Sequence, residues 1–342
     1  MKLTNKQWRL AARPVGDIKA SDFALTEVDV PTLGDKEFLI RNIYLSLDPT
    51  HRLWTREEDS YMPSVKINDV MRGFTLGVIE KSNNENYPVG SIVTGVVGWE
   101  EYSIANDSSL VSVVNMDKRL PLTARFGLME HIGLTAYFGI LDILKAKHGE
   151  TLVVSGAAGA VGSIAVQIGK IMGCRVIAIA GSEEKCQWLK NDLGADETIN
   201  YRTADVSTAL TEICPEGVDM FFDNVGGKML EAVLNHINMN ARIAMCGAIS
   251  TYGDDEKPYS PSNIYNLLHK RAKIEGFIVL DYAQDQRWWK RAEDEMTQWY
   301  LQGRMNYRLD IIDGFENAPE ALMKLFVGSN KGKLLIKISD EV

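Results

Sequence analysis

The chain has 342 residues, of which 45% are hydrophobic and 24% charged, and its formal net charge is −9. This length suits two domains, and the composition is that of an ordinary globular protein. The acidic balance without a basic block argues against a nucleic-acid partner, and no apolar run approaches the roughly 20 residues that a membrane helix needs.

The amino-terminal residues 1–10 are rich in charged and amide side chains and lack the apolar core of a signal peptide, so we expect a cytoplasmic protein. The four cysteines form no C-x-x-C pair, and no histidine stands beside them at ligand spacing. We therefore expect no zinc site and interpret them as buried free thiols in a reducing compartment. They are Cys174, Cys186, Cys214 and Cys246.

The first third of the chain is predicted to be rich in β-strands, because short apolar or alternating runs are separated by Gly, Pro, Asn and Asp. Such short strands with irregular turns indicate a compact barrel or sandwich. The predicted strands are Phe23–Val30, Phe38–Leu45, Gly77–Lys81, Ile92–Trp99 and Glu101–Ile104.

From about Leu122 the pattern becomes helical and then alternates between strands and helices, which predicts a doubly wound parallel sheet. The last strand-like segments, Tyr307–Ile312 and Leu334–Ile338, are expected to return to the first domain. The predicted helices are 122–130, 135–144, 183–193, 206–213, 228–235 and 264–270. The predicted strands are 152–154, 175–180, 197–199, 218–222, 242–246 and 274–279.

The stretch Thr151–Met172 has the pattern of a dinucleotide-binding unit. A buried-strand run, Leu152–Val154, is followed by a small-residue turn and then by isoleucines at helical spacing. Glycines at 156, 159 and 162 allow a tight turn, a close approach to a pyrophosphate and close packing of the helix. The helix amino terminus then favours an anion. A glycine-bearing turn in an unrelated α/β protein is the alternative.

The tip of the second strand bears on the choice of nucleotide. An NAD site usually has an acidic residue there to accept the ribose hydroxyls, but this strand ends Ala180-Gly181-Ser182 with Lys185 just beyond. A small tip and a nearby lysine suit a 2′-phosphate, which favours NADPH. Glu183 and Glu184 argue the other way unless they point away, and Lys185 is alternatively an ordinary solvated lysine.

Small and polar residues follow three further strands, at the edge of the sheet where ligands bind. With the glycine turn, they resemble the zinc-independent medium-chain dehydrogenase/reductase superfamily, in the branch of the prostaglandin reductases (leukotriene hydroxydehydrogenases) and curcumin reductases. The resemblance covers nearly the whole chain. The motifs are 45–49, 134–139, 158–163, 181–185, 200–203, 223–227, 246–252, 314–317 and 332–333.

The resemblance implies a GroES-like β-barrel domain, residues 1–122 completed by 307–342, and a Rossmann NADPH-binding domain, residues 123–306. It also implies a homodimer that joins the Rossmann sheets edge to edge. The cofactor residues it implies are Gly159, Ala160, Val161 and Gly162 for the pyrophosphate, and Gly181, Ser182, Lys185 and Tyr201 for the 2′-phosphate side. Asn224, Cys246, Gly247, Ala248, Ile249, Ser250, Tyr252, Phe277, Ile278 and Val279 line the remaining pocket, and Asn330 reaches the cofactor from the carboxyl-terminal segment.

The reaction that the resemblance implies is NADPH-dependent reduction of a carbon–carbon double bond conjugated to a carbonyl. Hydride adds to the β-carbon, so negative charge gathers on the carbonyl oxygen as an enolate and needs a hydrogen-bond donor. The ribose 2′-hydroxyl of the cofactor is one donor, and Tyr252 is the protein candidate because a phenol donates at neutral pH and can relay a proton. Tyr252 is alternatively a packing residue of its loop.

Two positions depart from the family pattern. The family usually has Tyr-Met after the Asp-Pro turn, where this chain has Thr50-His51, and Met-Pro where this chain has His131-Ile132. Both are expected near the substrate mouth, so Thr50, His51 and His131 are candidate substrate residues. The two histidines are alternatively ordinary packing residues. Arg52, Trp54, Tyr61, Met62 and Met71-Arg72 belong to the same region and are candidates to shape the pocket.

Three functions fit the sequence. The first is an NADPH-dependent reductase of enones and enals, a zinc-independent oxidoreductase acting on a small molecule. The second is an NADPH:quinone oxidoreductase on the same fold. The third is a non-enzymatic NADPH-binding sensor.

Overall fold

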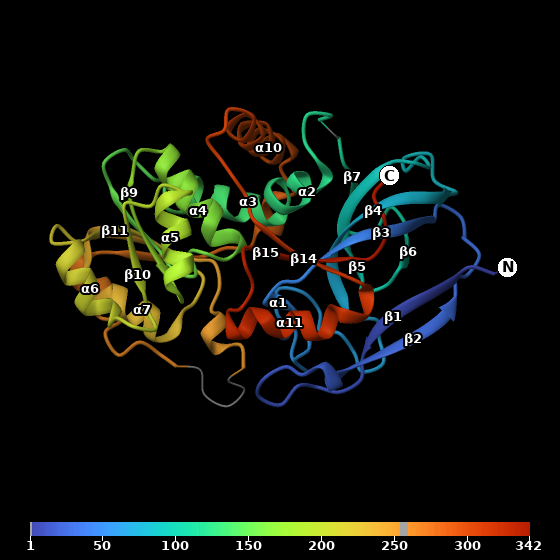
Figure 1. Cartoon of the computed structure of the whole chain (residues 1–342), viewed down its shortest axis with the longest axis horizontal. Helices are drawn as coiled ribbons and strands as arrows, with labels where there is room; N and C mark the ends of the chain where they lie inside the picture. Colours follow the sequence, from blue (N-terminus) through green and yellow to red (C-terminus); the bar gives the residue numbers. More distant parts are fainter. Residues whose placement is uncertain (1, 116, 254–258) are drawn as a thin grey trace. The chain divides into compact units, whose positions relative to one another are not determined.

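The computed structural model describes residues 2–115, 117–253 and 259–342, and the chain divides into two compact units (Figure 1). The first unit comprises Met1–Leu122, Leu309–Asn330 and Leu334–Val342. The second comprises Thr123–Arg308 and Lys331–Lys333. The chain therefore leaves the second unit after Arg308 and touches it once more at Lys331–Lys333.

The first unit is built mainly of antiparallel strands. Its larger sheet has the order β14-β15-β3-β4-β5-β7, with β6 also paired to β3, while β1 and β2 form a separate hairpin. The elements are β1 (Thr4–Leu10), η1 (Ala20–Asp22), β2 (Phe23–Asp29), β3 (Phe38–Ser46), α1 (Thr50–Trp54), β4 (Arg72–Ser82), β5 (Ile92–Gly98), β6 (Tyr102–Ala105), β7 (Val111–Val113), α2 (Leu122–Ala124), β14 (Leu309–Asp313), η5 (Phe315–Asn317), α11 (Ala318–Val327) and β15 (Lys333–Lys337).

One hydrophobic cluster of the first unit joins both ends of the sequence. It contains the fully buried Leu45, Trp54 and Trp99 together with Leu334 and Ile336 from β15. Strand β15 pairs antiparallel with β3, with Leu335 opposite Ser46. The last strand-like segment thus completes a sheet that begins near the amino terminus.

The second unit has a six-stranded parallel sheet of order β10-β9-β8-β11-β12-β13. Its order reverses between β8 and β11, which is where ligands bind in such sheets. The elements are η2 (Arg125–Met129), α3 (His131–Phe138), η3 (Gly139–Ile143), β8 (Thr151–Val154), α4 (Ala160–Ile171), β9 (Arg175–Ala180), α5 (Glu183–Asn191), β10 (Glu197–Asn200), α6 (Val206–Ile213), β11 (Val218–Asp223), α7 (Gly227–Leu234), β12 (Ile237–Met245), η4 (Ile249–Thr251), α8 (Asn266–Lys270), β13 (Lys273–Gly276), α9 (Val279–Tyr282) and α10 (Gln286–Leu301).

The predicted fold class is confirmed: a β-rich unit is combined with a Rossmann-type parallel sheet. Helices α4 and α5 pack on β9, and α7 packs on β11 (Figure 1). Strands 152–154, 175–180, 218–222 and 242–246 and helix 206–213 lie where they were predicted, to within a few residues.

Some elements differ from the prediction. The strand predicted over Ile274–Val279 ends at Gly276, and Val279 instead begins α9. The segment predicted as one helix over 122–130 is the short α2 followed by the π-helical turn η2. Strands β1 and β7 and helices α1, α9, α10 and α11 were not predicted. None of the helices in the described ranges is both long and apolar enough to cross a bilayer.

Helix α4, which follows the glycine turn, is fixed to the chain just before it leaves the second unit. The buried Gln167 side chain donates to the Asn306 carbonyl at 2.9 Å and accepts from the Asn306 amide at 2.6 Å. Its amide also donates to the Ser163 carbonyl at 3.0 Å. One side chain therefore satisfies both backbone groups of Asn306.

We expect Gln167→Leu to lower the free energy of unfolding by about 2 kcal/mol, because it leaves buried backbone donors and acceptors without their partner. Urea denaturation measures this change. Gln187→Leu on α5 is the matched control, since Gln187 is exposed and its amide only reaches Glu183 at 3.3 Å. An equal loss in both variants would contradict the explanation.

Candidate functional site

The glycine turn after β8 has the geometry of a phosphate-binding loop. Gly156 has a φ of +57°, and a Cβ on Gly162 would collide with the Gly156 carbonyl oxygen and lie 2.8 Å from the Ala157 Cα. Gly159 is the N-cap of α4, and no side chain caps the helix there. The helix amino terminus therefore presents backbone amides that suit a pyrophosphate.

The turn is joined to the end of β11 by a buried carboxylate. Asp223 accepts hydrogen bonds from the Ser155 hydroxyl at 2.7 Å, the Val225 amide at 2.9 Å and the Gly226 amide at 3.0 Å. Asn224 adds bonds from its backbone amide to the Ser155 hydroxyl at 2.9 Å and from its side chain to the Ser155 carbonyl at 2.7 Å. The ends of β8 and β11, at the point where the order of the sheet reverses, are thus held together by hydrogen bonds.

Burial raises the pKa of Asp223, and the hydrogen bonds from Gly226, Val225 and Ser155 offset this only in part. The side chain is fully buried, and its Oδ2 has no hydrogen-bond partner. The carboxylate therefore stabilises the loop geometry at a cost in desolvation.

The loop after β12 closes over the end of β11. The Ile249 amide donates to the Asn224 carbonyl at 3.4 Å, and the Ser250 hydroxyl donates to the Val225 carbonyl at 2.6 Å. Residues Cys246–Tyr252 and Asn224 therefore lie together at the carboxyl ends of β11 and β12, as the sequence predicted for neighbouring strands. Burial raises the pKa of the Cys246 thiol to about 12, so it is protonated at neutral pH.

Tyr252 has a defined place in this loop. Its phenol oxygen accepts a hydrogen bond from the Ala248 amide at 3.2 Å. The ring is half-buried, and a Cβ on Gly247 would stand 3.4 Å from the phenol oxygen. Tyr252 is thus held by its own loop at the edge of the sheet where ligands bind.

The tip of β9 brings together the residues predicted for the 2′-phosphate side. Ser182 caps α5 by accepting from the Lys185 amide at 3.3 Å. A Cβ on Gly181 would lie 2.8 Å from the Tyr201 phenol oxygen, so a larger residue there would displace that ring. The Arg202 guanidinium lies 6.0 Å from the Tyr201 ring centre. These groups are suited to a phosphate.

The two acids that argued against NADPH are both engaged. Glu184 accepts from Lys331 at 2.8 Å, and Arg308 lies 3.5 Å from the same oxygen. Glu183 accepts from the Gln187 side chain at 3.3 Å. Neither carboxylate occupies the end of β9 itself, because α5 begins only at Glu183.

Phe277, Ile278 and Val279 follow β13 at the sheet edge. The Phe277 ring meets Phe222 edge to face at 6.3 Å between ring centres, and it would contact a Cβ on Gly139 at 2.8 Å. Val279 is buried as the first residue of α9. Asn330 is a buried residue counted with the first unit, directly before Lys331.

The candidate substrate residues of the first unit differ from each other in exposure. Thr50 shares a hydrogen bond with the Tyr61 hydroxyl, and both side chains are solvent-accessible. His51 has no exposed surface, and its ring packs 5.3 Å from Trp54 and 5.2 Å from Trp99 between centres. This placement favours the packing alternative for His51.

His131 begins α3 in the second unit and is also buried. Its ring faces Phe126 edge to face at 6.4 Å, and its carbonyl accepts from the Thr135 hydroxyl at 2.6 Å. Beside it, Arg125 pairs with Glu130 at 2.8 Å and with Glu293 at 2.6 Å. A role of His131 toward the substrate stays a prediction.

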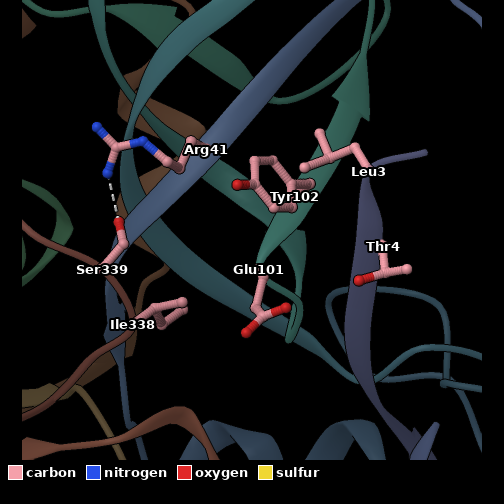
Figure 2. A pocket seen from close by; sticks show the side chains of 7 residues that line it. All are labelled: Leu3, Thr4, Arg41, Glu101, Tyr102, Ile338 and Ser339. Carbon is pink, nitrogen blue, oxygen red and sulfur yellow. Dashed lines mark hydrogen bonds between the residues drawn. The ribbon is translucent and has the colours of Figure 1, made fainter. Parts of the chain in front are cut away.

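Cys174, Cys214 and a pocket of the first unit lie outside the site described above. The cysteines are free thiols, and within the described residues no three His, Cys, Asp or Glu side chains are grouped to hold a metal. A pocket of about 280 Å³ lies in the first unit, and Figure 2 shows the side chains that line it. None of the predicted site residues lines it. Its lining residues are Leu3, Thr4, Arg41, Glu101, Tyr102, Ile338 and Ser339.

Comparison with known proteins identifies the family. Residues 6–113 match the profile described as the N-terminal domain of oxidoreductase, and residues 160–298 match that described as zinc-binding dehydrogenase. The chain is 39% identical to the NADPH-dependent curcumin reductase of Escherichia coli, over 99% of both chains. It is 39% identical to prostaglandin reductase 1 of Bos taurus, over 97% of this chain and 98% of that protein.

A solved structure agrees with these relatives. CurA of Vibrio vulnificus in complex with NADPH is 42% identical, covers 98% of this chain and 100% of its own, and superposes with a TM-score of 0.92. The chain belongs to the medium-chain dehydrogenase/reductase superfamily, in the branch of the curcumin and prostaglandin reductases. The predicted family is therefore confirmed. The zinc-binding dehydrogenase profile describes a broad family. That this chain binds no zinc stays a prediction.

Some residues that hold the loops of the site together were not singled out from the sequence. Ser155 and Asp223 were seen only as parts of motifs, although their hydrogen bonds join two loops. The acid Asp223, which follows the apolar run of residues 220–222 at the end of β11, was the available signal. Lys331 and Arg308 both pair with Glu184. No local sequence pattern could predict this, because they lie far from Glu184 along the chain.

The raised pKa of Asp223 predicts a pH dependence of stability. A folded state that binds the proton more tightly than the unfolded chain loses free energy of unfolding as the pH rises above the ordinary aspartate value of 3.8 and through the raised folded-state pKa. Asp223→Asn keeps an oxygen for the three donors and cannot ionise. We therefore expect its stability relative to wild type to increase with pH, measured by urea denaturation at a series of pH values.

Asp205→Asn is a control of opposite sign. Hydrogen bonds from the Thr208 amide and hydroxyl lower the pKa of Asp205, so its contribution to stability is present above the ordinary pKa and lost in acid. This variant should lose stability relative to wild type as the pH rises. A difference between Asp223→Asn and wild type that is the same at every pH would show that Asp223 does not titrate as described.

Proposed function

We propose that this protein is an NADPH-dependent reductase of the carbon–carbon double bond of α,β-unsaturated ketones and aldehydes. The observation that supports this most directly is Tyr252, whose phenol is fixed by its own loop at the carboxyl ends of β11 and β12. A hydrogen-bond donor at that place suits the enolate oxygen that forms in such a reduction. Relatives named as curcumin and prostaglandin reductases support the same chemistry.

The residues present fit the cofactor. The space left by Gly162, the helix amino terminus at Ala160 and the bare strand tip at Gly181 are what a dinucleotide phosphate backbone requires. Gly159–Gly162 would hold the pyrophosphate, and Lys185 and Tyr201 the 2′-phosphate. Asn224, the loop 246–252 and the segment 277–279 would line the rest, with Asn330 from the carboxyl-terminal segment. When bound, NADPH supplies the hydride.

Within this site Tyr252 stabilises charge and delivers a proton. A phenol can accept one hydrogen bond and donate its own proton at the same time. The Ala248 amide donates to the phenol oxygen at 3.2 Å, which fixes the position of the group proposed to donate to the enolate oxygen. Protonation at the α-carbon then completes the reduction. The neighbouring Cys246 thiol stays protonated and does not compete as a nucleophile.

We propose Thr50 and Tyr61 as the residues of the first unit that contact the substrate. Their hydroxyl groups are hydrogen-bonded to each other, and Tyr61 also meets Trp54 edge to face at 6.3 Å. The Arg72 guanidinium lies 5.5 Å from the Trp54 ring centre. The hydroxyl groups of Thr50 and Tyr61, beside the aromatic ring of Trp54, suit the binding of a planar, conjugated carbonyl compound.

We also propose that the protein is a cytoplasmic homodimer. Strand β13 ends the parallel sheet and has one paired neighbour, β12. Helix α8, which packs on β12, exposes 72% of Leu268, and Tyr265 before it is 70% exposed. An open strand edge beside exposed apolar residues favours association with a second copy.

Oxidation of NADPH should accompany turnover of a 2-alkenal, an acyclic enone or a cyclic enone, whereas NADH should be a poor donor. We expect Tyr252→Phe to lower kcat about 100-fold with little change in NADPH affinity, because a donor to the transition state is removed. Loss of NADPH absorbance measures the rates. Tyr102→Phe, in the pocket of the first unit that none of the predicted site residues lines, is the control.

Other outcomes identify other functions. Turnover of a quinone alone would make the protein a quinone oxidoreductase and remove the enolate argument. Tight NADPH binding without turnover of any enone or quinone would favour a sensor. Full activity of Tyr252→Phe would assign the phenol a packing role in its loop.

The dimer proposal has its own test. Leu268→Glu places a charge on the exposed apolar face of α8 and should shift the protein toward monomer in light scattering coupled to gel filtration. Val15→Glu, on a residue that is 85% exposed in the first unit, is the control. A wild-type protein that is monomeric at micromolar concentration would contradict the proposal.

A further inference from the structure

Three charged side chains meet beside the tip of β9. The Lys331 ammonium donates to Glu184 Oε1 at 2.8 Å, and the Arg308 guanidinium lies 3.5 Å from the same oxygen. Arg308 also covers the ring of Trp188 at 5.6 Å from its centre. Because Glu184 and Trp188 are four residues apart on α5, Arg308 lies along one face of that helix. We call Glu184, Arg308 and Lys331 the Glu184 cluster.

The backbone holds the two cations of the cluster in place. Arg308 is where the chain leaves the second unit, and Lys331 is where it returns. The amide of Lys333 donates to the Arg308 carbonyl at 2.9 Å, and Lys333 is 2% exposed. Gly332 has a φ of +84°, and a Cβ there would collide with the same carbonyl. The segment 331–333 therefore fits closely against Arg308.

The cluster contributes little to folding. The side chains of Lys331 and Glu184 are 54% and 60% exposed, and ion pairs this accessible to water are worth little in stability. The charges of the cluster also act on a charged ligand that binds beside it. Glu184 lies in the first turn of α5, two residues after Ser182 and directly before Lys185, where the 2′-phosphate of the cofactor is expected. An unpaired carboxylate there would repel a phosphate.

We infer that Lys331 and Arg308 restrain and neutralise Glu184, and that Lys331 is thereby a residue that determines the preference for NADPH over NADH. The inference rests on the proposed function. Acidic residues near the end of the second strand accept the ribose hydroxyls of NADH in related folds. The negative charge of an acid in this region must therefore be neutralised before a 2′-phosphate can bind. Hydrogen bonding and the positive charge of Lys331 lower the pKa of Glu184, in agreement with a carboxylate held as an anion by its partner.

Binding of NADP⁺ and NAD⁺ to the purified full-length protein, followed by isothermal titration calorimetry at low ionic strength, tests this inference without turnover. We expect Lys331→Met to raise the Kd for NADP⁺ about fivefold and to leave the Kd for NAD⁺ unchanged, because only the former carries the 2′-phosphate. The double variant Lys331→Met/Glu184→Gln should return the ratio of the two constants to within about twofold of wild type, since the net charge of the cluster is restored.

Lys190→Met is the matched control. Lys190 also lies on α5 and pairs with Glu197 at 3.2 Å, with side chains 51% and 41% exposed. This variant should leave both dissociation constants unchanged. Thermal unfolding of each variant shows whether a change in binding reflects a change in folding.

Each result decides the matter. Equal changes for NADP⁺ and NAD⁺, no change in Lys331→Met, a similar change in Lys190→Met, or a double variant that stays weak for NADP⁺ would each overturn the inference. If wild type prefers NAD⁺, both the inference and the proposed function fail. If wild type prefers NADP⁺ but reduces no enone, the substrate part of the proposed function fails and the same ratio still decides the inference.

Discussion

The hydrogen bonds that Ser155 makes with Asp223 and Asn224 are the constraint on which the site depends. They join the ends of β8 and β11, the two central strands between which the order of the sheet reverses. The reversal opens a space at the carboxyl edge, because the chain after one strand turns to one face and the chain after the other turns to the opposite face. Without a link across this space, the glycine turn and the Asn224 loop would each follow their own helix. With it, both loops present their backbone groups at fixed positions.

A carboxylate is an expensive choice for this link, since burial raises its pKa and disfavours its charge. Its advantage is that one oxygen accepts from a hydroxyl and two amides at once. The loop that carries Tyr252 is bonded in turn to the carbonyls of Asn224 and Val225. The position of the phenol therefore depends on a chain of hydrogen bonds that begins at Ser155.

The parallel sheet was predictable because strands buried on both faces must be continuously apolar, as at Leu152–Val154 and Val176–Ile179. Helix α10 was missed because its buried residues, Ala292 and Met296, are few among charged and amide side chains. Strand β1 was missed because its sequence, TNKQWRL, has no apolar alternation: two of its buried residues, Asn5 and Gln7, are polar. The glycine turn was found by spacing alone, whereas the Glu184 cluster depends on residues more than a hundred positions apart, which no local pattern encodes.

The loops proposed to bind the cofactor and the residues proposed to contact the substrate are constrained differently. The phosphate loop, the strand tip and the Tyr252 loop are fixed mainly by backbone geometry, so the amino acids allowed there are few. Thr50 and Tyr61, in contrast, are joined through their side-chain hydroxyls. Either position can provide a hydroxyl for a substrate. The family pattern has a tyrosine where this chain has Thr50, and here the phenol on that hydroxyl comes from Tyr61 instead. A threonine leaves more room than a tyrosine at the same backbone position, while His51 behind it fills the core between two tryptophans. With the proposed function, we therefore expect this chain to differ from the reductases it resembles in which conjugated carbonyl compound it accepts.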